Sequence, residues 1–173
     1  CQKTPGKLAS SHTLQSVEFK NGSFKTNKGM TYDSGTLFTG ILLRKYENGQ
    51  ALQVDTIVEG LVQGLSKAWY QNGERMWERL YLNGKKEGKH RRWYRGGAPK
   101  SEGNYSEDFY QGNLREWYPN GQMYKDFNYV DGQEDGHQKM WKSDGRVKAN
   151  YVVRNGRRYG LTGVKNCINV FEK

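Results

Sequence analysis

The hydrophobic and polar positions of this chain repeat at a fixed interval, and glycines mark the repeat most clearly. The first glycine column is Gly40, Gly64, Gly88, Gly112, Gly136 and Gly160, evenly spaced along the chain. A second column follows nine residues later, at Gly49, Gly73, Gly97, Gly121 and Gly145. A third lies near the end of each unit, at Gly60, Gly84, Gly132 and Gly156, with Asp108 as its exception. Aspartate tolerates the same left-handed turn conformation, so the pattern indicates one tandem array of short units.

Each unit contains two segments rich in strand-forming residues. The first segment carries an aromatic pair, at Trp69-Tyr70, Trp93-Tyr94 and Trp117-Tyr118, and in the last unit Trp141 is followed by Lys142. The second segment carries a column of strand formers, made of Ile57, Tyr81, Tyr105, Tyr129 and Val153. We therefore expect every unit to form one β-hairpin, with no helix in the chain.

Short glycine-containing turns join the two strands of each expected hairpin. The dipeptides Asn48-Gly49, Asn72-Gly73, Asn120-Gly121 and Asp144-Gly145 favour two-residue type I′ loops, and Gly96-Gly97 suits the same turn. Counting across such a loop places Trp69 opposite Met76 and Tyr70 opposite Arg75. We expect the Trp column at 69, 93, 117 and 141 to be largely buried and an aromatic stripe to stay accessible for binding.

The predicted fold class is all-β, an antiparallel meander of tandem 24-residue β-hairpin repeats in an extended or curved single sheet. Residues 1–14 are expected to form a flexible N-terminal tether, and residues 15–39 a degenerate N-terminal capping hairpin from segments 17–22 and 30–35. Residues 40–159 are the five repeats. Residues 160–173 are expected to supply a C-terminal capping strand that includes Ile168, Val170 and Phe171.

The composition is consistent with a folded protein that has an aromatic core. Aromatic residues make up 13% of the 173 residues, and disordered chains are poor in such side chains. The longest apolar stretch, residues 37–43, is interrupted by Thr39 and Gly40 and is far shorter than the about 20 residues of a membrane-spanning helix. The formal net charge of +10 favours anionic partners, namely acidic proteins, lipid headgroups or nucleic acid.

The strongest charge cluster is a candidate binding patch around the start of the unit at Gly88. Its basic and aromatic members are Lys85, Lys86, Lys89, Arg91, Arg92, Trp93, Tyr94 and Arg95, interrupted by Glu87 alone among acids. Basic side chains between aromatic ones can bind phosphates while a ring stacks on a base, or bind anionic lipid. The alternative is a solubilising face whose long side chains cover aromatic rings.

Cys1 is a candidate lipidation site. A cysteine followed by a polar segment, here residues 2–12, is typical of a bacterial lipoprotein after its signal peptide has been removed. The alternative is an arbitrary boundary of the sequence. The other cysteine, Cys167, is expected to be a small buried residue, so a disulfide framework is not predicted.

No residue set predicts catalysis or a metal site. The three histidines, His12, His90 and His137, have no cysteine or carboxylate at metal-ligand spacing, and no nucleophile signature occurs. One acidic column, Glu78, Glu102 and Asp126, recurs in the second segment of successive units, and Asn150 extends it. We expect Arg75, Arg79 and Lys125 to neutralise these acids. The sequence therefore predicts a protein that is not an enzyme and needs no cofactor or metal.

The unit at residues 112–121 (GNLREWYPNG), continued by YVDG at 129–132, resembles the MORN-repeat variant, the bacterial form of the "membrane occupation and recognition nexus" motif. The resemblance extends from Gly40 to about Gly160. It implies a β-meander without catalytic activity that acts in protein interaction or membrane association, and such proteins are also grouped as antitoxin-like components of toxin–antitoxin systems. The chain departs from the motif at Lys45-Tyr46, Asp108 and Lys142, where we expect less regular packing.

Together these features predict a non-catalytic repeat scaffold for protein interaction, lipid-anchored at the bacterial cell envelope. A cytoplasmic location is the alternative if Cys1 carries no lipid. The alternative functions are an antitoxin-like component that neutralises a partner toxin, and a peripheral module that binds anionic lipid. A protein partner is expected. Nucleic acid is disfavoured because no recognised module for it is present, and no small-molecule substrate is expected.

Overall fold

The computed structural model describes residues 14–19 and 23–163, and every regular element in these ranges is a β-strand. The first strands are β1 (Ser16–Glu18), β2 (Phe24–Asn27), β3 (Met30–Asp33), β4 (Thr36–Leu37), β5 (Gly40–Lys45), β6 (Ala51–Val58), β7 (Leu61–Val62) and β8 (Gly64–Trp69). The remaining strands are β9 (Arg75–Leu82), β10 (Lys85–Trp93), β11 (Pro99–Ser106), β12 (Phe109–Trp117), β13 (Met123–Val130), β14 (Gln133–Trp141), β15 (Val147–Arg154) and β16 (Arg157–Leu161).

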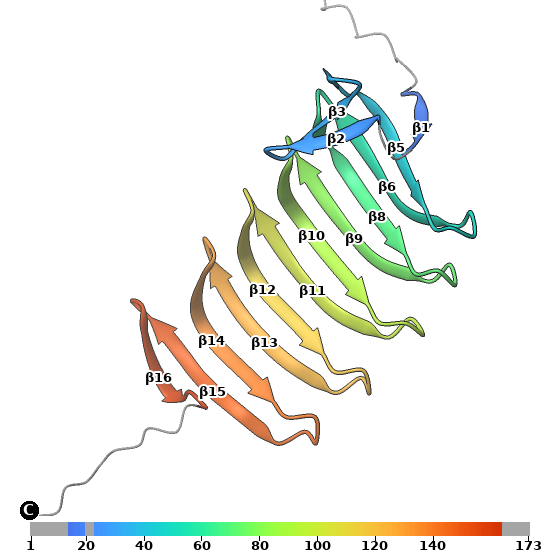
Figure 1. Ribbon diagram of the computed structural model, residues 1–173. Helices are drawn as coiled ribbons and strands as arrows, with labels where there is room; N and C mark the ends of the chain where they lie inside the picture. The colour runs from blue at the N-terminus through green and yellow to red at the C-terminus, as the bar shows by residue number, and fades with distance from the viewer. Residues whose placement is uncertain (1–13, 20–22, 164–173) are drawn as a thin grey trace, which may run out of the picture.

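The strands form one long sheet and one small sheet (Figure 1). From β5 to β16, successive strands of the long sheet lie side by side and pair antiparallel, with the short β7 paired only to β6. The predicted fold class, an antiparallel meander of β-hairpins, is therefore confirmed. Figure 1 shows the strands following one another as a twisted ladder, as the right-handed twist of β-strands requires.

The N-terminal end differs from the expected single hairpin. Strand β1 joins the long sheet parallel to β5, with Ser16 beside Ile41, while β2, β3 and β4 form a separate three-stranded sheet. That small sheet is joined to the long one by a hydrogen bond from the Thr31 N–H to the Gly60 carbonyl (2.8 Å). A buried apolar cluster caps this end of the array and consists of Phe24, Phe38, Leu42 and Ile57. The predicted C-terminal strand residues Ile168, Val170 and Phe171 lie outside the described residues.

Type I′ turns occur at the third glycine column. Asn83 and Gly84 have φ values of 51° and 78°, so both central residues are left-handed, as this two-residue turn requires. At the exception, Glu107 and Asp108 have φ values of 51° and 74°, which confirms that aspartate tolerates the glycine position. The Asp108 carboxylate also accepts a hydrogen bond from the Lys86 N–H at 2.9 Å. The side chain thereby attaches its turn to the preceding unit.

The Asn-Gly dipeptides form a different turn, so the prediction of type I′ loops there was wrong. In the loop after β8, Gly73 is left-handed, with φ of 83°, and Asn72 is not. The Tyr70 carbonyl accepts a hydrogen bond from the Gly73 N–H (2.8 Å), and the Tyr70 N–H donates to the Glu74 carbonyl (2.8 Å), which closes the longer loop. The Asn72 side chain accepts a hydrogen bond from the Glu74 N–H at 3.2 Å, an asparagine turn that removes the need for positive φ.

The longer loop changes the predicted pairing only beside the turn, because a bulge takes up the extra loop residue. Trp69 pairs with Arg75, and Ala68 pairs with Trp77, so Met76 is the extra residue of a β-bulge. The predicted pairings of Trp69 with Met76 and of Tyr70 with Arg75 were therefore wrong. A register shift adjoins the equivalent loop in every unit. Beyond the bulge the strands keep the register that the counting implies, with Gly64 paired to Tyr81, so Trp77 lies on the face opposite Trp69.

The core lies on one face of the sheet, which we call the inner face, and the Trp column is not part of it. The buried apolar residues of this face in the long sheet are Leu42, Ile57, Ala68, Leu114, Phe127, Ala149, Tyr151 and Val153. A row of rings crosses the same face, with centroids 4.5–5.8 Å apart, through Tyr81, His90, Tyr105, Tyr110 and Tyr129. Trp69, Trp93, Trp117 and Trp141 are only half-buried, which corrects the expectation that this column is largely buried.

The aromatic pairs instead join neighbouring repeats. The Tyr70 hydroxyl donates to the Trp93 carbonyl at 2.8 Å, and the Tyr94 hydroxyl donates to the Trp117 carbonyl at 2.9 Å. The same bond joins Tyr46 to Trp69 and Tyr118 to Trp141, at 2.9 and 3.1 Å. A bond between successive units, rather than burial of the indole, thus explains why the tyrosine follows the tryptophan in these units.

Candidate functional site

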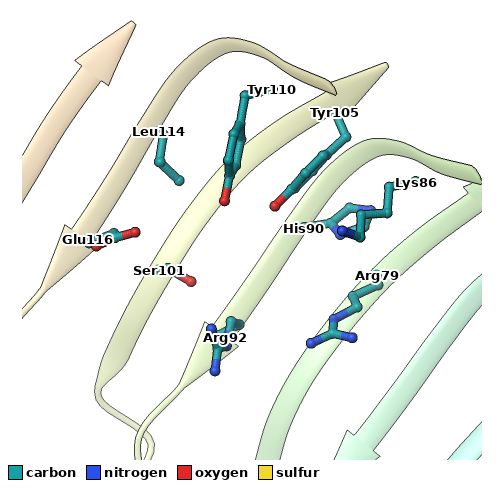
Figure 2. A pocket seen from close by; sticks show the side chains of 10 residues that line it. Arg79, Lys86, His90, Arg92, Ser101, Tyr105, Tyr110, Leu114 and Glu116 are labelled. Atoms are coloured by element: carbon teal, nitrogen blue, oxygen red, sulfur yellow. The ribbon is translucent and has the colours of Figure 1, made fainter. Parts of the chain in front are cut away.

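A polar hollow of about 230 Å³ lies on the inner face, above strands β9 to β12. We call it the cationic hollow, and its lining residues are Arg79, Lys86, His90, Arg92, Ser101, Gly103, Tyr105, Tyr110, Leu114 and Glu116. Figure 2 shows the side chains around a common space, with Arg79 and Arg92 on one side and the rings of Tyr105 and Tyr110 on the other. Four neighbouring strands therefore contribute to one concave site.

The hollow exists because Gly103 has no side chain. Gly103 pairs with His90 on one side and with Leu114 on the other, so it occupies the centre of the inner face. At the same position of the other units the chain has the larger residues Asp55, Arg79, Phe127 and Tyr151. A β-carbon on Gly103 would lie 2.9 Å from Cδ1 of Leu114, so any larger residue would require a shift of that leucine.

The hollow has an excess of positive charge. Within residues 14–19 and 23–163, Arg79, Lys86 and Arg92 form no ion pair, and Glu116 is the only carboxylate in the lining. The guanidinium of Arg79 instead stacks 4.2 Å from the centroid of Trp77, and the Lys86 ammonium lies 5.2 Å from the centroid of Tyr105. Contacts with rings hold both cations in place and leave their N–H groups available to an anion.

His90 forms one wall of the hollow and is neutral at pH 7. The residue is 7% exposed, and Nε2–H donates to the Leu80 carbonyl at 2.8 Å. Burial is the main cause that lowers the pKa of His90, and the charges of Arg79 and Lys86 lower it further. Gln138, at the same repeat position, donates its amide to the Asn128 carbonyl at 2.8 Å. Both side chains therefore satisfy a carbonyl next to the bulge that the first glycine column produces.

The pH dependence of the free energy of unfolding tests whether burial keeps His90 neutral in the folded protein. Above about pH 6.5, His90 is neutral in both the folded and the unfolded chain. Below it, the unfolded chain takes up a proton first, so the free energy of unfolding falls as the pH falls, by at most about 1.4 kcal/mol per pH unit. His90→Gln should remove this contribution, because Gln138 shows that glutamine fits the position. Urea unfolding between pH 5 and pH 8 measures the effect, with His137→Gln, on the exposed outer face, as the control. If the free energy of unfolding depends on pH in the same way in His90→Gln and in the wild-type protein, the lowered pKa of His90 is contradicted.

Hydroxyl groups complete the polar lining. Burial, and then the neighbouring Tyr110 hydroxyl, raise the pKa of Tyr105 far above its usual range, so this phenol stays protonated and can donate. Ser101 contributes a further hydroxyl from the same strand as Gly103. With the three cations, these hydroxyls give the hollow more hydrogen-bond donors than acceptors, and Glu116 is its one carboxylate. Such a lining suits an anionic group that accepts several hydrogen bonds.

A second hollow, which we call the aromatic hollow, continues the first. Its volume is about 260 Å³, and it is lined by Arg92, Tyr94, Lys100, Ser101, Glu116, Trp117, Tyr118 and Tyr124. Arg92, Ser101 and Glu116 belong to both hollows, so the two form one continuous inner groove. The Lys100 ammonium lies 5.1 Å from the centroid of the Tyr94 ring. The rings of Tyr118 and Tyr124 pack edge to face, with their centroids 5.0 Å apart. One end of the groove is therefore cationic and the other is aromatic.

The candidate basic patch predicted from the sequence is not one surface. Lys89 and Arg91 both contact Glu102, at 3.3 and 3.1 Å, on the outer face of the sheet. Lys85 pairs with Glu107 at the edge, and Arg95 lies over the ring of Tyr70 at 5.4 Å. The half-buried Trp93 does not line the groove, whereas Lys86, Arg92 and Tyr94 do. Successive strand residues point to opposite faces, and this alternation divides the cluster.

The acidic column is neutralised on the outer face, but mostly by other residues than predicted. Cross-strand pairing produces a row in which basic and acidic side chains alternate from strand to strand: Lys67, Glu78, Arg91, Glu102, Arg115, Asp126 and Lys139. Arg75 contacts Glu78 at 3.5 Å as expected. Arg79 and Lys125 instead lie on the inner face, over the rings of Trp77 and Phe127. The acids are therefore never neighbours, because a basic residue lies between each pair.

Two kinds of feature, metal-ligand clusters and membrane-spanning helices, are not found in the part of the chain that the structure describes. No group of three His, Cys, Asp or Glu side chains there could hold a metal ion. No helix in that part has the length and hydrophobicity needed to cross a membrane. Cys1, His12 and Cys167 lie outside the described residues.

Comparison with known proteins does not identify the chain. No protein-family model matches the sequence, and a search of curated proteins finds no match. The MORN-like character thus remains a prediction from the repeat. The groove residues Gly103, Ser101, Tyr110 and Glu116 were not predicted as a site. The available signal was Gly103, the single glycine in a repeat position that otherwise carries large or charged side chains.

Proposed function

We propose that this protein is a non-catalytic repeat scaffold that binds a protein partner, and that the inner groove is its binding surface. The observation that carries the proposal is one concave site that combines exposed parts of aromatic rings with three cations that form no ion pair within the described residues. Tyrosine, tryptophan and arginine are the residues most enriched where proteins bind each other tightly. The outer face is less suited, because its charged row is already paired internally.

The absence of a catalytic function is part of the proposal. The groove offers donors and rings, but its single carboxylate, Glu116, has no second acid in the lining to act with. The phenol of Tyr105 stays protonated and so is no base at neutral pH. The buried imidazole of His90 uses its Nε2–H on the Leu80 carbonyl. Binding, rather than turnover, is the activity these groups support.

Two charge-reversal variants test the binding surface. Arg79→Glu/Arg92→Glu reverses two positive charges in the groove, and Lys89→Glu/Arg91→Glu reverses two positive charges on the outer face. We expect a partner captured from bacterial envelope extracts to be lost with the groove variant and retained with the outer-face variant. Binding should persist at raised ionic strength, because aromatic contacts are not screened by salt. A partner that is retained equally by both variants would contradict the proposal.

The cell envelope is a separate proposal, based on the predicted lipid at Cys1, and mass spectrometry of the native protein tests it. Direct lipid binding is the main competing function. Tight, salt-resistant binding of the unlipidated protein to anionic vesicles would favour that function over a protein partner, since purely electrostatic attachment is lost at moderate salt.

A further inference from the structure

We propose, building on the function above, that the partner presents to the groove an extended segment with a single acidic side chain. An apolar or aromatic side chain lies two or four residues from it. The acidic side chain enters the cationic hollow above Gly103. The apolar side chain enters the aromatic hollow beside Tyr118 and Tyr124. The chemistry of each hollow and the spacing between them carry the proposal.

The cationic hollow matches a carboxylate. Arg79 and Arg92 come from neighbouring strands, β9 and β10, and each presents the forked donor set that pairs with both oxygens of a carboxylate. Lys86 adds a third cation, and Ser101 and Tyr105 add hydroxyl donors. Since the cations have no acidic partner within the described residues, an incoming carboxylate displaces no existing ion pair there.

The aromatic hollow matches an apolar side chain. Tyr94, Tyr118 and Tyr124 are all half-buried, so each leaves part of its ring exposed beside the hollow that it lines. The Tyr94 hydroxyl is already bonded to the Trp117 carbonyl and the Tyr118 hydroxyl to the Trp141 carbonyl, at 2.9 and 3.1 Å. These bonds fix both rings before a ligand arrives, and a fixed ring loses little entropy on binding.

The spacing of the two hollows favours an extended polypeptide. Both lie above β11, where Gly103 is in the floor of the first hollow and Ser101 is shared with the second. Side chains two residues apart on a strand are separated by roughly 7 Å. A segment extended along β11 has the same spacing, so its residues i and i+2, or i and i+4, reach both hollows. A free phosphate or a single headgroup would fill the first hollow only.

Glu116 limits the number of acids that the segment carries. Its carboxylate lies between the two hollows and belongs to the lining of both. A second acidic residue close to the first would meet this charge at short range and be repelled. The groove therefore selects one acidic side chain, whereas a polyanion such as nucleic acid would place repeated charges against Glu116.

A set of designed peptides tests the inference directly. The probe is a fluorescein-labelled decapeptide of glycine and serine with one Glu and, two residues later, one Phe. The control peptides replace Glu by Gln or Phe by Ala. We expect fluorescence anisotropy to show binding of the first peptide and about tenfold weaker binding of each control, because each loses one recognised group. A peptide with Glu and Phe four residues apart measures which spacing the groove prefers.

Protein variants locate the binding on the groove. Arg79→Gln/Arg92→Gln should abolish discrimination between the Glu and Gln peptides, whereas Lys89→Gln/Arg91→Gln on the outer face should leave binding unchanged. Gly103→Ala should weaken binding by narrowing the hollow, and circular dichroism reports whether each variant keeps its fold. Glu116→Gln should relax the selection and allow a peptide with a second Glu to bind as well as the first.

The outcomes separate this inference from the proposed function. Equal binding of the Glu and Gln peptides, or groove-dependent binding of inorganic phosphate or phosphatidylglycerol vesicles that exceeds peptide binding, would overturn the acidic-segment inference alone. A partner that is still lost in Arg79→Glu/Arg92→Glu would then leave the scaffold function standing. A partner that is retained by that variant would contradict the function itself, whatever the peptides do.

Discussion

Phe127→Ala is expected to lower the free energy of unfolding by about 3 to 5 kcal/mol, the usual cost of truncating a large core side chain. Phe127 is 4% exposed and belongs to a buried cluster with Ala149, Tyr151 and Val153. Its ring packs edge to face on the ring of Tyr151, with the two centroids 6.0 Å apart, and the Lys125 ammonium lies 4.6 Å from the Phe127 centroid. Truncation would open a cavity at the centre of the inner face.

Trp117→Ala is the informative comparison, since the repeat pattern singles out this tryptophan. The side chain is only half-buried, and its bond to Tyr94 uses the backbone carbonyl, which alanine retains. We therefore expect a loss of roughly half that of Phe127→Ala, in proportion to the area removed from water. Urea unfolding followed by circular dichroism measures both, with the exposed Tyr159→Ala as a control within about 0.5 kcal/mol of wild type. A larger loss of unfolding free energy for Trp117→Ala than for Phe127→Ala would contradict the assignment of the core to the inner face.

Arg44→Met is expected to destabilise the protein by about 3 to 5 kcal/mol, because it leaves a buried carboxylate without its cation. Asp55 is 3% exposed and accepts hydrogen bonds from Arg44 Nη1 and Gln53 Nε2, both at 2.7 Å, and from the Ser66 hydroxyl. Methionine keeps the apolar stem of arginine but removes the charge. The two neutral donors that remain stabilise the charged carboxylate only in part.

A second substitution separates the charge from the packing. Asp55→Asn in the Arg44→Met background removes the buried charge and should recover part of the lost stability, as a double-mutant cycle would measure. Arg75→Met is the matched control, since Arg75 contacts Glu78 at 3.5 Å with 67% of its side chain exposed. We expect that control to cost less than about 1 kcal/mol. An equally small cost for Arg44→Met would mean that the Asp55 site is effectively solvated.

The groove, the paired outer face and the buried site around Asp55 show one chain using its repeat positions for different purposes. In the unit that begins at Gly88, the central inner position of the second strand is Gly103, and the cationic hollow results. In the next unit the same position is Phe127, and it fills the core. The site thus lies where the repeat is broken, which is why the regular part of the pattern did not predict it.

The three glycine columns illustrate how far local sequence could predict structure. All three have positive φ, which glycine adopts without cost, and the sequence correctly predicted turns at the second and third columns but assigned no distortion to the first. It did not distinguish their roles. Gly112 distorts the strand at a bulge, Gly73 closes the longer loop, and Gly84 completes a type I′ turn. The pattern of hydrogen bonds decides among these, and that pattern exists only in the folded hairpin.

By itself the sequence determined the all-β class, the period of the hairpins and the order of the strands from β5 to β16, because strand propensity and turn formation depend on residues near each other in the chain. Only the tertiary structure decided which face of the sheet holds the core and which side chains meet across the strands. One extra loop residue and one compensating bulge per unit keep the two strands in the counted register, so side chains alternate between the faces along each strand. For that reason Lys86 and Arg92 meet Arg79 in the inner groove, while Lys89 and Arg91, their neighbours in sequence, pair with Glu102 on the opposite side.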